Sequence, residues 1–307
     1  MEAHANSVED ILVDGLSFKL KNSAKYVTDR RSVTFHPSGS NVYQTSSGTK
    51  VIKIQLTGDA WLVPNSVRLM FNLKNNDTDA AHVLRTISGP WSFFRRMRIL
   101  CGGQIVEDFE LNRTQEMIQQ LHSEDTRDND DVEGFGTRYD NATNRAAAAA
   151  STATMPGIPG NSSRRVSTRL LSGLLNQEKW LPIRYCPITI ELELVSSATD
   201  PVVAAAAPFG ATDTSTDWTI EDVQLKADLC TLDNAVDNQI ADHLLSGKAL
   251  PINYQTWISQ SQAVSGQSMS INVARAVTRL SSIYPPEGLE HLLPPNDERR
   301  RGLRPFV

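Results

Sequence analysis

An acidic segment is the strongest candidate for metal chemistry in this 307-residue sequence, because residues 124–134 are rich in Asp and Glu. With Asn129 at the first position of an EF-hand loop, suitable residues fall at the third, fifth, sixth and twelfth positions: Asp131, Glu133, Gly134 and Asp140. The first position is nevertheless Asn, the last is Asp where such loops use Glu, and no strong helical pattern follows. We therefore expect a solvated, charged loop that holds no specific metal.

The histidines and cysteines fall at no catalytic or metal-ligand spacing. The six histidines are scattered through unrelated contexts: His4, His36, His82, His122, His243 and His291. Cys101, Cys186 and Cys230 form no Cys-x-x-Cys pair, so we expect no zinc site and no disulfide framework, but three small buried thiols in a reducing compartment. The sequence also lacks a nucleophile elbow, a P-loop and a Gly-x-Gly-x-x-Gly loop. It therefore predicts no catalytic residue, no cofactor and no enzyme.

Two further motifs have simpler structural explanations. Gly102-Gly103-Gln104 matches the catalytic tripeptide of peptide-release factors, but it lies between two strand-like segments, where a hairpin turn explains it. The last residues carry a basic group that could neutralise phosphates: Arg299, Arg300, Arg301 and Arg304. A net charge of -5 argues against a protein that binds nucleic acid through its overall charge. We expect a solvated terminus without nucleic-acid contact.

The elements that must position any site are mainly β-strands. Apolar and polar residues alternate in five segments, at 51–56, 67–73, 188–194, 223–229 and 269–273. Successive strand residues point to opposite faces of a sheet, so each segment has one buried face, as in an antiparallel sandwich. We expect the core of this sandwich to include seven of the alternating residues: Ile54, Leu69, Phe71, Ile99, Ile190, Leu192 and Leu225.

Turn, helix and loop signals divide the rest of the chain. Strand-like residues at 93–100 and 104–109 flank the Gly-Gly turn and predict a hairpin. Helical spacing occurs at 112–122, with Asn112 as the expected N-cap, and at 233–245, before Gly247. Polar, Pro/Gly/Ser-punctuated stretches predict two long loops inserted into the sandwich, at 123–169 and 196–217.

Composition bounds the class of protein. A content of 40% hydrophobic and 21% charged residues is typical of a folded protein. The first residues show no secretory signal, and no apolar run approaches the ~20 residues that span a bilayer. We expect a soluble protein that is made inside a cell and is not secreted.

The order of these segments resembles that of a viral family. GPWSFFRR at 89–96 precedes the Gly-Gly hairpin, LPIRYCP at 181–187 and WTIEDV at 218–223 precede later strands, and ALPI follows the second helix at 249–252. This order is similar to that of the double jelly-roll major capsid proteins of Polinton-like viruses, virophages and related tailless double-stranded DNA viruses, over roughly residues 10–284. The resemblance implies an all-β fold with short helices and antiparallel jelly-roll sandwiches. It also implies that three chains form a pseudo-hexagonal capsomer, and it transfers no catalytic residue.

On that resemblance the chain divides into five parts. These are an N-terminal arm and first strand region (1–48), a first jelly roll (49–232), a connector helix (233–249), the first strands of an incomplete second jelly roll (250–284) and an irregular basic tail (285–307). Two or three strands cannot bury both faces of a sandwich, so Trp257, Ile271 and Val273 must fold back onto the first barrel or stay exposed. We therefore expect the full chain to be less soluble than residues 10–248.

The predicted function is structural. The protein would self-assemble into homotrimeric capsomers that contact neighbouring capsomers and penton or minor capsid proteins in a virion, encoded by a virus or an endogenous viral element. Two alternatives remain: a cellular β-sandwich module that binds carbohydrate or protein, and a hydrolase on a β scaffold. Exposed aromatic residues clustered on one face would favour the sugar binder. A converging Ser/His/Asp group or carboxylate pair would favour the hydrolase.

Overall fold

Eight long strands form four nested antiparallel ladders in this computed structural model, which describes residues 27–46, 48, 50–123, 157–202, 214–259, 280 and 282. From the outside inward, the ladders are β1 (Val27–Phe35) with β12 (Trp218–Leu232), β3 (Val51–Leu56) with β10 (Ile188–Leu194), β5 (Arg68–Asn75) with β9 (Ser163–Thr168), and β7 (Phe94–Cys101) with β8 (Gln104–Glu110). The strands thus pair like the two arms of one long hairpin, whose tip is the turn between β7 and β8.

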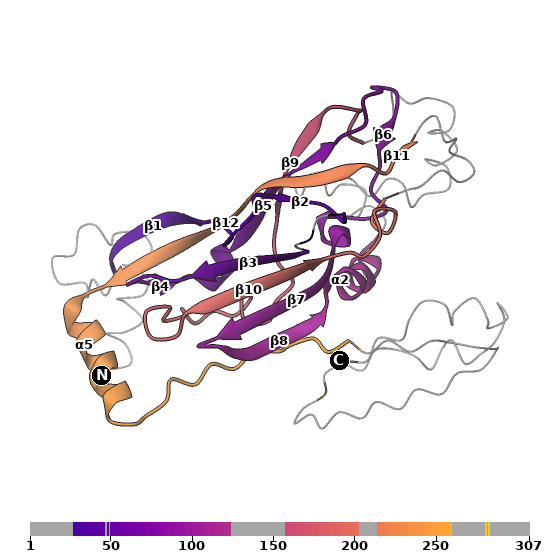
Figure 1. Ribbon diagram of the computed structural model, residues 1–307. Coiled ribbons are helices and arrows are strands. Elements are labelled where there is room, and N and C mark those ends of the chain that lie inside the picture. Colours follow the sequence, from indigo (N-terminus) through magenta and orange to yellow (C-terminus); the bar gives the residue numbers. More distant parts are fainter. Residues whose placement is uncertain are drawn as a thin grey trace, which may run out of the picture.

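This long hairpin is rolled into two facing sheets (Figure 1). One sheet has the order β1-β12-β5-β9 and the other β3-β10-β7-β8, so successive ladders fall alternately in the first and the second sheet. Two short strands, β2 (Val42–Tyr43) and β4 (Trp61–Leu62), also pair with β12. Eight strands rolled in this way make a jelly roll, and the predicted antiparallel jelly-roll sandwich is confirmed.

The core lies between the two sheets and follows the alternation of the sequence. All seven predicted core residues have no exposed surface. Aromatic side chains join the sheets: the rings of Phe71 and Phe94 meet edge to face at 5.7 Å, and those of Phe93 and Trp218 at 4.8 Å. Such edge-to-face pairs add stability beyond the apolar area that they bury. The alternating strands therefore produce one continuous hydrophobic core.

The tip of the hairpin is the predicted Gly-Gly turn. Gly102 and Gly103 have φ angles of 55° and 84°, and β7 and β8 pair directly on either side of them. Two consecutive residues with positive φ fit a tight hairpin turn whose twist matches that of the strands, and glycine adopts this conformation without strain. The structure thus confirms the hairpin.

Two strands were not expected as such. Residues 163–168 form β9, so the expectation of a continuous loop over 123–169 is wrong there. Only Val166 and Thr168 of β9 are buried, because the strand lies at the edge of its sheet, and its sequence therefore shows almost no alternation. The second expected loop likewise contains the two-residue strand β11 (Thr214–Ser215).

Helices lie at the ends of the sandwich. The two predicted helices are present as α2 (Leu111–Gln120) and α5 (Asn234–Leu245), and two 3-10 turns, η2 (Pro64–Ser66) and η3 (Pro90–Phe93), precede strands. Asp233 caps α5 by accepting a hydrogen bond from the amide of Ala235. The predicted cap of α2 is wrong: Glu110 precedes the helix, and Asn112 lies inside its first turn. No helix in the described part of the chain is long and apolar enough to cross a membrane.

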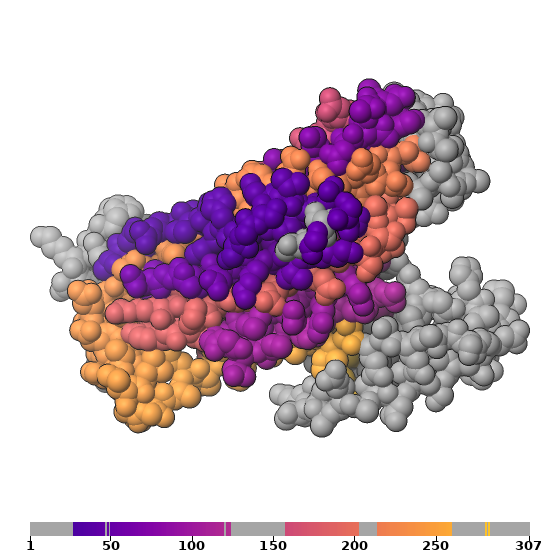
Figure 2. Space-filling model, in the orientation of Figure 1, coloured from indigo at the N-terminus to yellow at the C-terminus, as the bar shows by residue number. Residues whose placement is uncertain are grey.

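Residues 250–259 run along the edge of β8 (Figures 1 and 2). The Tyr254 hydroxyl donates to the carbonyl of Val106, and Ser259 Oγ accepts the amide of Glu110 at 2.7 Å. Ile252, Tyr254 and Trp257 pack against the core. This stretch contains no strand, and the expected strand around 269–273, with Ile271 and Val273, lies outside the described residues. Residues 250–259 therefore complete the first barrel by covering a sheet edge.

Candidate functional site

Three long connections meet at one end of the sandwich. They follow β5, β8 and β10, and they pair with one another through β6 (Val83–Leu84), which runs parallel to β11. Isolated β-bridges also pair Leu84 with Ile158 and Thr86 with Val202. We call this group the loop cluster; its described residues are 76–88, 157–162, 195–202 and 214–217. Because each connection is tied to the next, the end of the barrel presents one composite surface.

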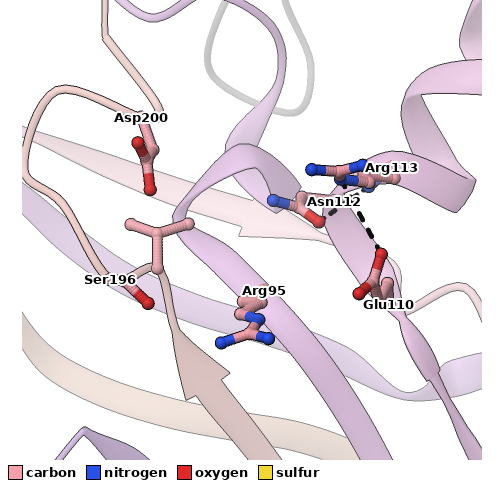
Figure 3. Close-up of a pocket in the computed structure, with 7 residues that line it drawn as sticks. Arg95, Glu110, Asn112, Arg113, Ser196 and Asp200 are labelled. Atoms are coloured by element: carbon pink, nitrogen blue, oxygen red, sulfur yellow. Dashed lines mark hydrogen bonds and ion pairs between the residues drawn. The ribbon is translucent and has the colours of Figure 1, made fainter. Parts of the chain in front are cut away.

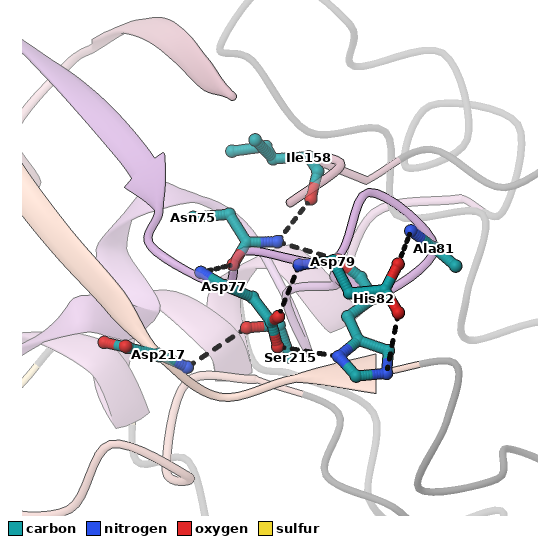
Figure 4. Close-up of polar contacts among 8 residues, drawn as sticks. All are labelled: Asn75, Asp77, Asp79, Ala81, His82, Ile158, Ser215 and Asp217. Atoms are coloured by element: carbon teal, nitrogen blue, oxygen red, sulfur yellow. Dashed lines mark hydrogen bonds and ion pairs between the residues drawn. The ribbon is translucent and has the colours of Figure 1, made fainter. Parts of the chain in front are cut away.

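Asn75 fixes the base of the loop cluster (Figure 4). It is the last residue of β5 and has no exposed surface. Its Nδ2 donates to the carbonyls of His82 and Ile158, each at 2.9 Å, and its Oδ1 accepts the amide of Asp77 at 3.1 Å. One buried amide side chain therefore holds two loops, at His82 and Ile158, that are far apart in the sequence.

An Asp–His group shapes the first loop (Figure 4). Asp77 Oδ2 lies 2.8 Å from Nδ1 of His82, and Asp79 Oδ2 lies 3.9 Å from Nε2 of the same ring. The amide of Asp79 and the ring of His82 both hydrogen-bond to the Asp77 carboxylate and hold its pKa below the usual range. Both ring nitrogens of His82 thus face carboxylates, an arrangement that orders the loop.

The third connection joins the same network through Asp217. The amide of Asn76 donates to the Asp217 carbonyl at 2.9 Å, and Asn76 Nδ2 donates to the Asp217 carboxylate at 3.1 Å. The Thr219 hydroxyl donates to the side-chain oxygen of Asn76. Gly160 comes so close that a Cβ there would lie 2.0 Å from the carbonyl oxygen of Asp79. The loops are consequently packed to contact, and their shape is fixed by polar side chains.

A small polar cavity lies where α2 begins (Figure 3). It has a volume of about 240 Å³ and is lined by Arg95, Glu110, Asn112, Arg113, Val195, Ser196 and Asp200. Its charges are nearly balanced: Arg113 Nε lies 3.7 Å from Glu110, and Arg95 lies 4.0 Å from Glu193. Sites for small ligands are usually larger and mostly apolar. This depression is better suited to contact with another polar surface.

The outer face of the second sheet carries a row of alternating charges. Glu191 lies between two cations, with Lys53 at 3.5 Å and Arg98 at 3.0 Å. Arg96 makes a two-pronged contact with Asp108, each N···O distance being 2.6 Å. Opposite charges on directly opposed strands favour one register over its neighbours. The arginines of β7 therefore favour the observed strand register through these ion pairs.

A buried carboxylate ties residues 250–259 to the barrel. Glu107 of β8 is 2% exposed; its Oε1 accepts the amides of Gly173 and Leu174, and its Oε2 accepts the Ser172 hydroxyl. The Thr256 side chain also hydrogen-bonds to it. Burial raises the pKa of Glu107, although these donors act in the opposite direction. Glu107 thus joins β8, the connection before β10 and the segment after α5.

Comparisons with known proteins find similarity in structure only. No protein-family model and no curated protein matches the sequence. The solved structures similar to this chain include PBCV-1 VP54, at 16% identity over 73% of this chain and 47% of that chain, with a TM-score of 0.44. They also include a Sputnik virophage structure, at 8% identity over 70% of this chain and 50% of that chain, with a TM-score of 0.38. A third is the Faustovirus major capsid protein, at 7% identity over 78% of this chain and 63% of that chain, with a TM-score of 0.38.

This chain spans about half the length of the PBCV-1 and Sputnik chains that it matches. The jelly-roll assignment itself rests on the strand pairing described above.

The structure brings few of the chemically capable residues together. The acidic segment with Asn129, Asp131, Glu133, Gly134 and Asp140, the histidines His4 and His291, and the basic group 299–304 lie outside the described residues. Of the described histidines, His82 joins the loop cluster, whereas His36 follows β1, His122 follows α2 and His243 lies in α5. Within the described ranges, no group of three or more His, Cys, Asp or Glu residues could hold a metal ion.

The cysteines depart from the expectation of three buried thiols. Cys230 is buried, but Cys101 and Cys186 are only partly buried and lie beside each other. Sequence reasoning also missed Asn75 and Glu107, since Ile158 and Gly173 are distant from them in the chain. It missed the role of His82 as well, although its partners Asp77 and Asp79 are only five and three positions away.

Proposed function

We propose that this chain is a structural capsid protein of the major capsid protein type, which acts by assembling with copies of itself. The observation that carries the proposal is the strand pairing: four nested ladders roll into two facing sheets. A jelly roll is a rigid wedge with free end loops, and viral capsids use it repeatedly as a building block.

The loop cluster supports an assembly role. Its loops are held by the side-chain hydrogen bonds of Asn75, Asn76 and Ser215. A surface that is ordered before contact loses little conformational entropy when it binds. The cluster and the polar cavity beside it therefore suit repeated contacts between copies.

In this proposal three copies form a pseudo-hexagonal capsomer, with α5 as the connector to a second barrel. A heterologous contact repeated around a threefold axis closes a ring. Neighbouring capsomers and penton or minor capsid proteins would then be the further partners, and the virion the location.

A carbohydrate-binding module is the second candidate, because lectin domains also use jelly rolls. Sugar binding favours tryptophan faces open to solvent. Trp91 and Trp218 are 3% and 2% exposed, and the three remaining tryptophans are half-buried: Trp61, Trp180 and Trp257. A hydrolase has less support, because both ring nitrogens of His82 face carboxylates and neither faces a hydroxyl nucleophile.

Size-exclusion chromatography with light scattering tests the proposal on the full chain across a concentration series. We expect a species with the mass of three protomers, whose share of the total protein increases with concentration. A protein that stays monomeric at every concentration, and that binds immobilised glycans in a parallel assay, would favour the carbohydrate-binding candidate and contradict ours.

A further inference from the structure

Two thiols meet at the end of the barrel opposite the loop cluster. Cys101 is the last residue of β7, and its ladder partner on β10 is Ile188. The ladder continues for one more step, because the amide of Gly102 donates to the carbonyl of Pro187 at 2.9 Å. Cys186 immediately precedes Pro187, in the turn that leads into β10, and therefore lies beside the Gly102–Gly103 turn and close to Cys101.

Several contacts confirm this proximity. A Cβ on Gly102 would lie 3.7 Å from Cys186 Sγ, and the side chains of Cys101 and Cys186 hydrogen-bond to each other. Both residues are partly exposed, so small reagents can reach them. Cys230 lies in the other sheet, on β12, and is 1% exposed.

We propose that Cys101 and Cys186 form a reversible disulfide when the protein meets an oxidant such as hydrogen peroxide. A disulfide needs Cα atoms within about 7 Å, and the two thiols already lie within hydrogen-bond distance of each other. The required movement is therefore small. This movement would involve the Gly102–Gly103 turn and the irregular residues before β10, which lie outside the paired residues of β7 and β10.

The chemistry balances with the peroxide as the oxidant. The Cys186 thiolate attacks one peroxide oxygen, the O–O bond breaks, and Cys186 becomes a sulfenic acid as hydroxide leaves. Cys101 then attacks the Cys186 sulfur, the S–S bond forms, and the sulfenic oxygen leaves with the Cys101 proton as water. Two thiols and one peroxide thus give one disulfide and two waters. Burial raises the pKa of Cys101 to about 12, which makes Cys101 the resolving thiol.

The disulfide would join positions that are 85 residues apart in the sequence, which is a long closed loop. Constraining such a loop in the unfolded chain raises the melting temperature, by about 5–10 °C for a chain of this size. The bond would fasten the tip of the β7–β8 hairpin to the start of β10. The disulfide involves no residue of the loop cluster, so this proposal is independent of the assembly proposal.

Peroxide treatment of the folded full chain tests the inference, followed by non-reducing peptide mapping and thermal denaturation. We expect a peptide that links Cys101 to Cys186, faster formation at higher pH, and a higher melting temperature that falls back on reduction. Cys230→Ser should behave like wild type. Cys101→Ser and Cys186→Ser should each abolish the cross-link and the shift.

Two outcomes overturn it. One is that Cys101 and Cys186 stay unlinked while the peroxide oxidises the protein elsewhere. The other is that they pair only between chains, in dimers on a non-reducing gel. The Cys101→Ser/Cys186→Ser double variant controls for folding, and under reducing conditions it should have the same melting temperature as the wild type.

Discussion

Replacing Glu107 by Ala should destabilise the barrel strongly. The side chain is 2% exposed and accepts hydrogen bonds from the Ser172 and Thr256 side chains and from the amides of Gly173 and Leu174. Alanine leaves two backbone amides without an acceptor, and each such buried donor costs about 1–3 kcal/mol. Removing a carboxylate that burial disfavours offsets part of this loss. We expect a net loss of about 2–4 kcal/mol in the free energy of unfolding.

Glu107→Gln is the matched control for this prediction. The amide oxygen can still accept both backbone amides, and the amide nitrogen can donate to Ser172 once that hydroxyl turns. The expected loss is under about 1 kcal/mol. The comparison of Glu107→Ala with Glu107→Gln therefore separates the effect of losing the hydrogen-bond acceptor from the effect of losing the charge.

The pH dependence provides a second readout. Burial raises the pKa of Glu107 in the folded protein above its unfolded value, so the folded state favours the protonated carboxyl. Its stabilising contribution is complete below the unfolded pKa and is lost as the pH rises through the folded pKa. Wild type should therefore gain stability relative to Glu107→Gln as the pH falls from neutral.

Urea denaturation of the three proteins from neutral pH down to the carboxylate range measures both effects. The reasoning is refuted if Glu107→Ala unfolds within about 0.5 kcal/mol of wild type, the size of an ordinary surface substitution. It is also refuted if Glu107→Gln is as damaging as alanine.

Three further predictions concern other parts of the fold. Asn75→Ala should cost about 2–3 kcal/mol in urea denaturation, since two carbonyls and one amide lose their partner, and limited proteolysis should then cut the loop cluster faster. Gly103→Ala should cost about 1 kcal/mol because its φ is 84°, whereas Gly58→Ala, at ordinary φ, should cost less in the same assay. A chain that ends at 249 should be less soluble in sedimentation assays than the full chain, and should lose at least about 3 kcal/mol of stability, because Tyr254 and Trp257 no longer cover the barrel.

The prediction for the chain that ends at 249 is the opposite of the solubility expected from the sequence. The alternation around 269–273 suggested strands without a barrel to join, and hence better behaviour for residues 10–248. The structure instead places residues 252–259 on the β8 edge and on the core. Sequence alone could not show this, because the segment contacts the barrel through isolated side chains and has no periodic pattern.

Strands that bury one face could be predicted, whereas the edge strand β9 could not. β5 and β10 alternate perfectly between buried and half-exposed residues, since each packs one face on the core. β9 is an edge strand whose sequence is Ser-Arg-Arg-Val-Ser-Thr, and only tertiary pairing with β5 makes it a strand. Its solvated residues carry no signal that distinguishes them from a loop.

The candidate site was less predictable than the core. Asn75 and Ile158 are far apart in the chain, and so are Asn76 and Asp217, so only the rolled topology brings them together. The same holds for Cys101 and Cys186, which share no motif. Local spacing predicts metal sites and nucleotide loops well, but it carries little information about a surface built from three separate connections.

Electron microscopy of the purified protein at high concentration tests the central claim, self-assembly of a jelly-roll capsid protein, most directly. We predict ring-shaped particles whose class averages show threefold symmetry with a pseudo-hexagonal outline. Particles no larger than a single barrel under every assembly condition, in a protein shown to be folded by its thermal transition, would contradict it.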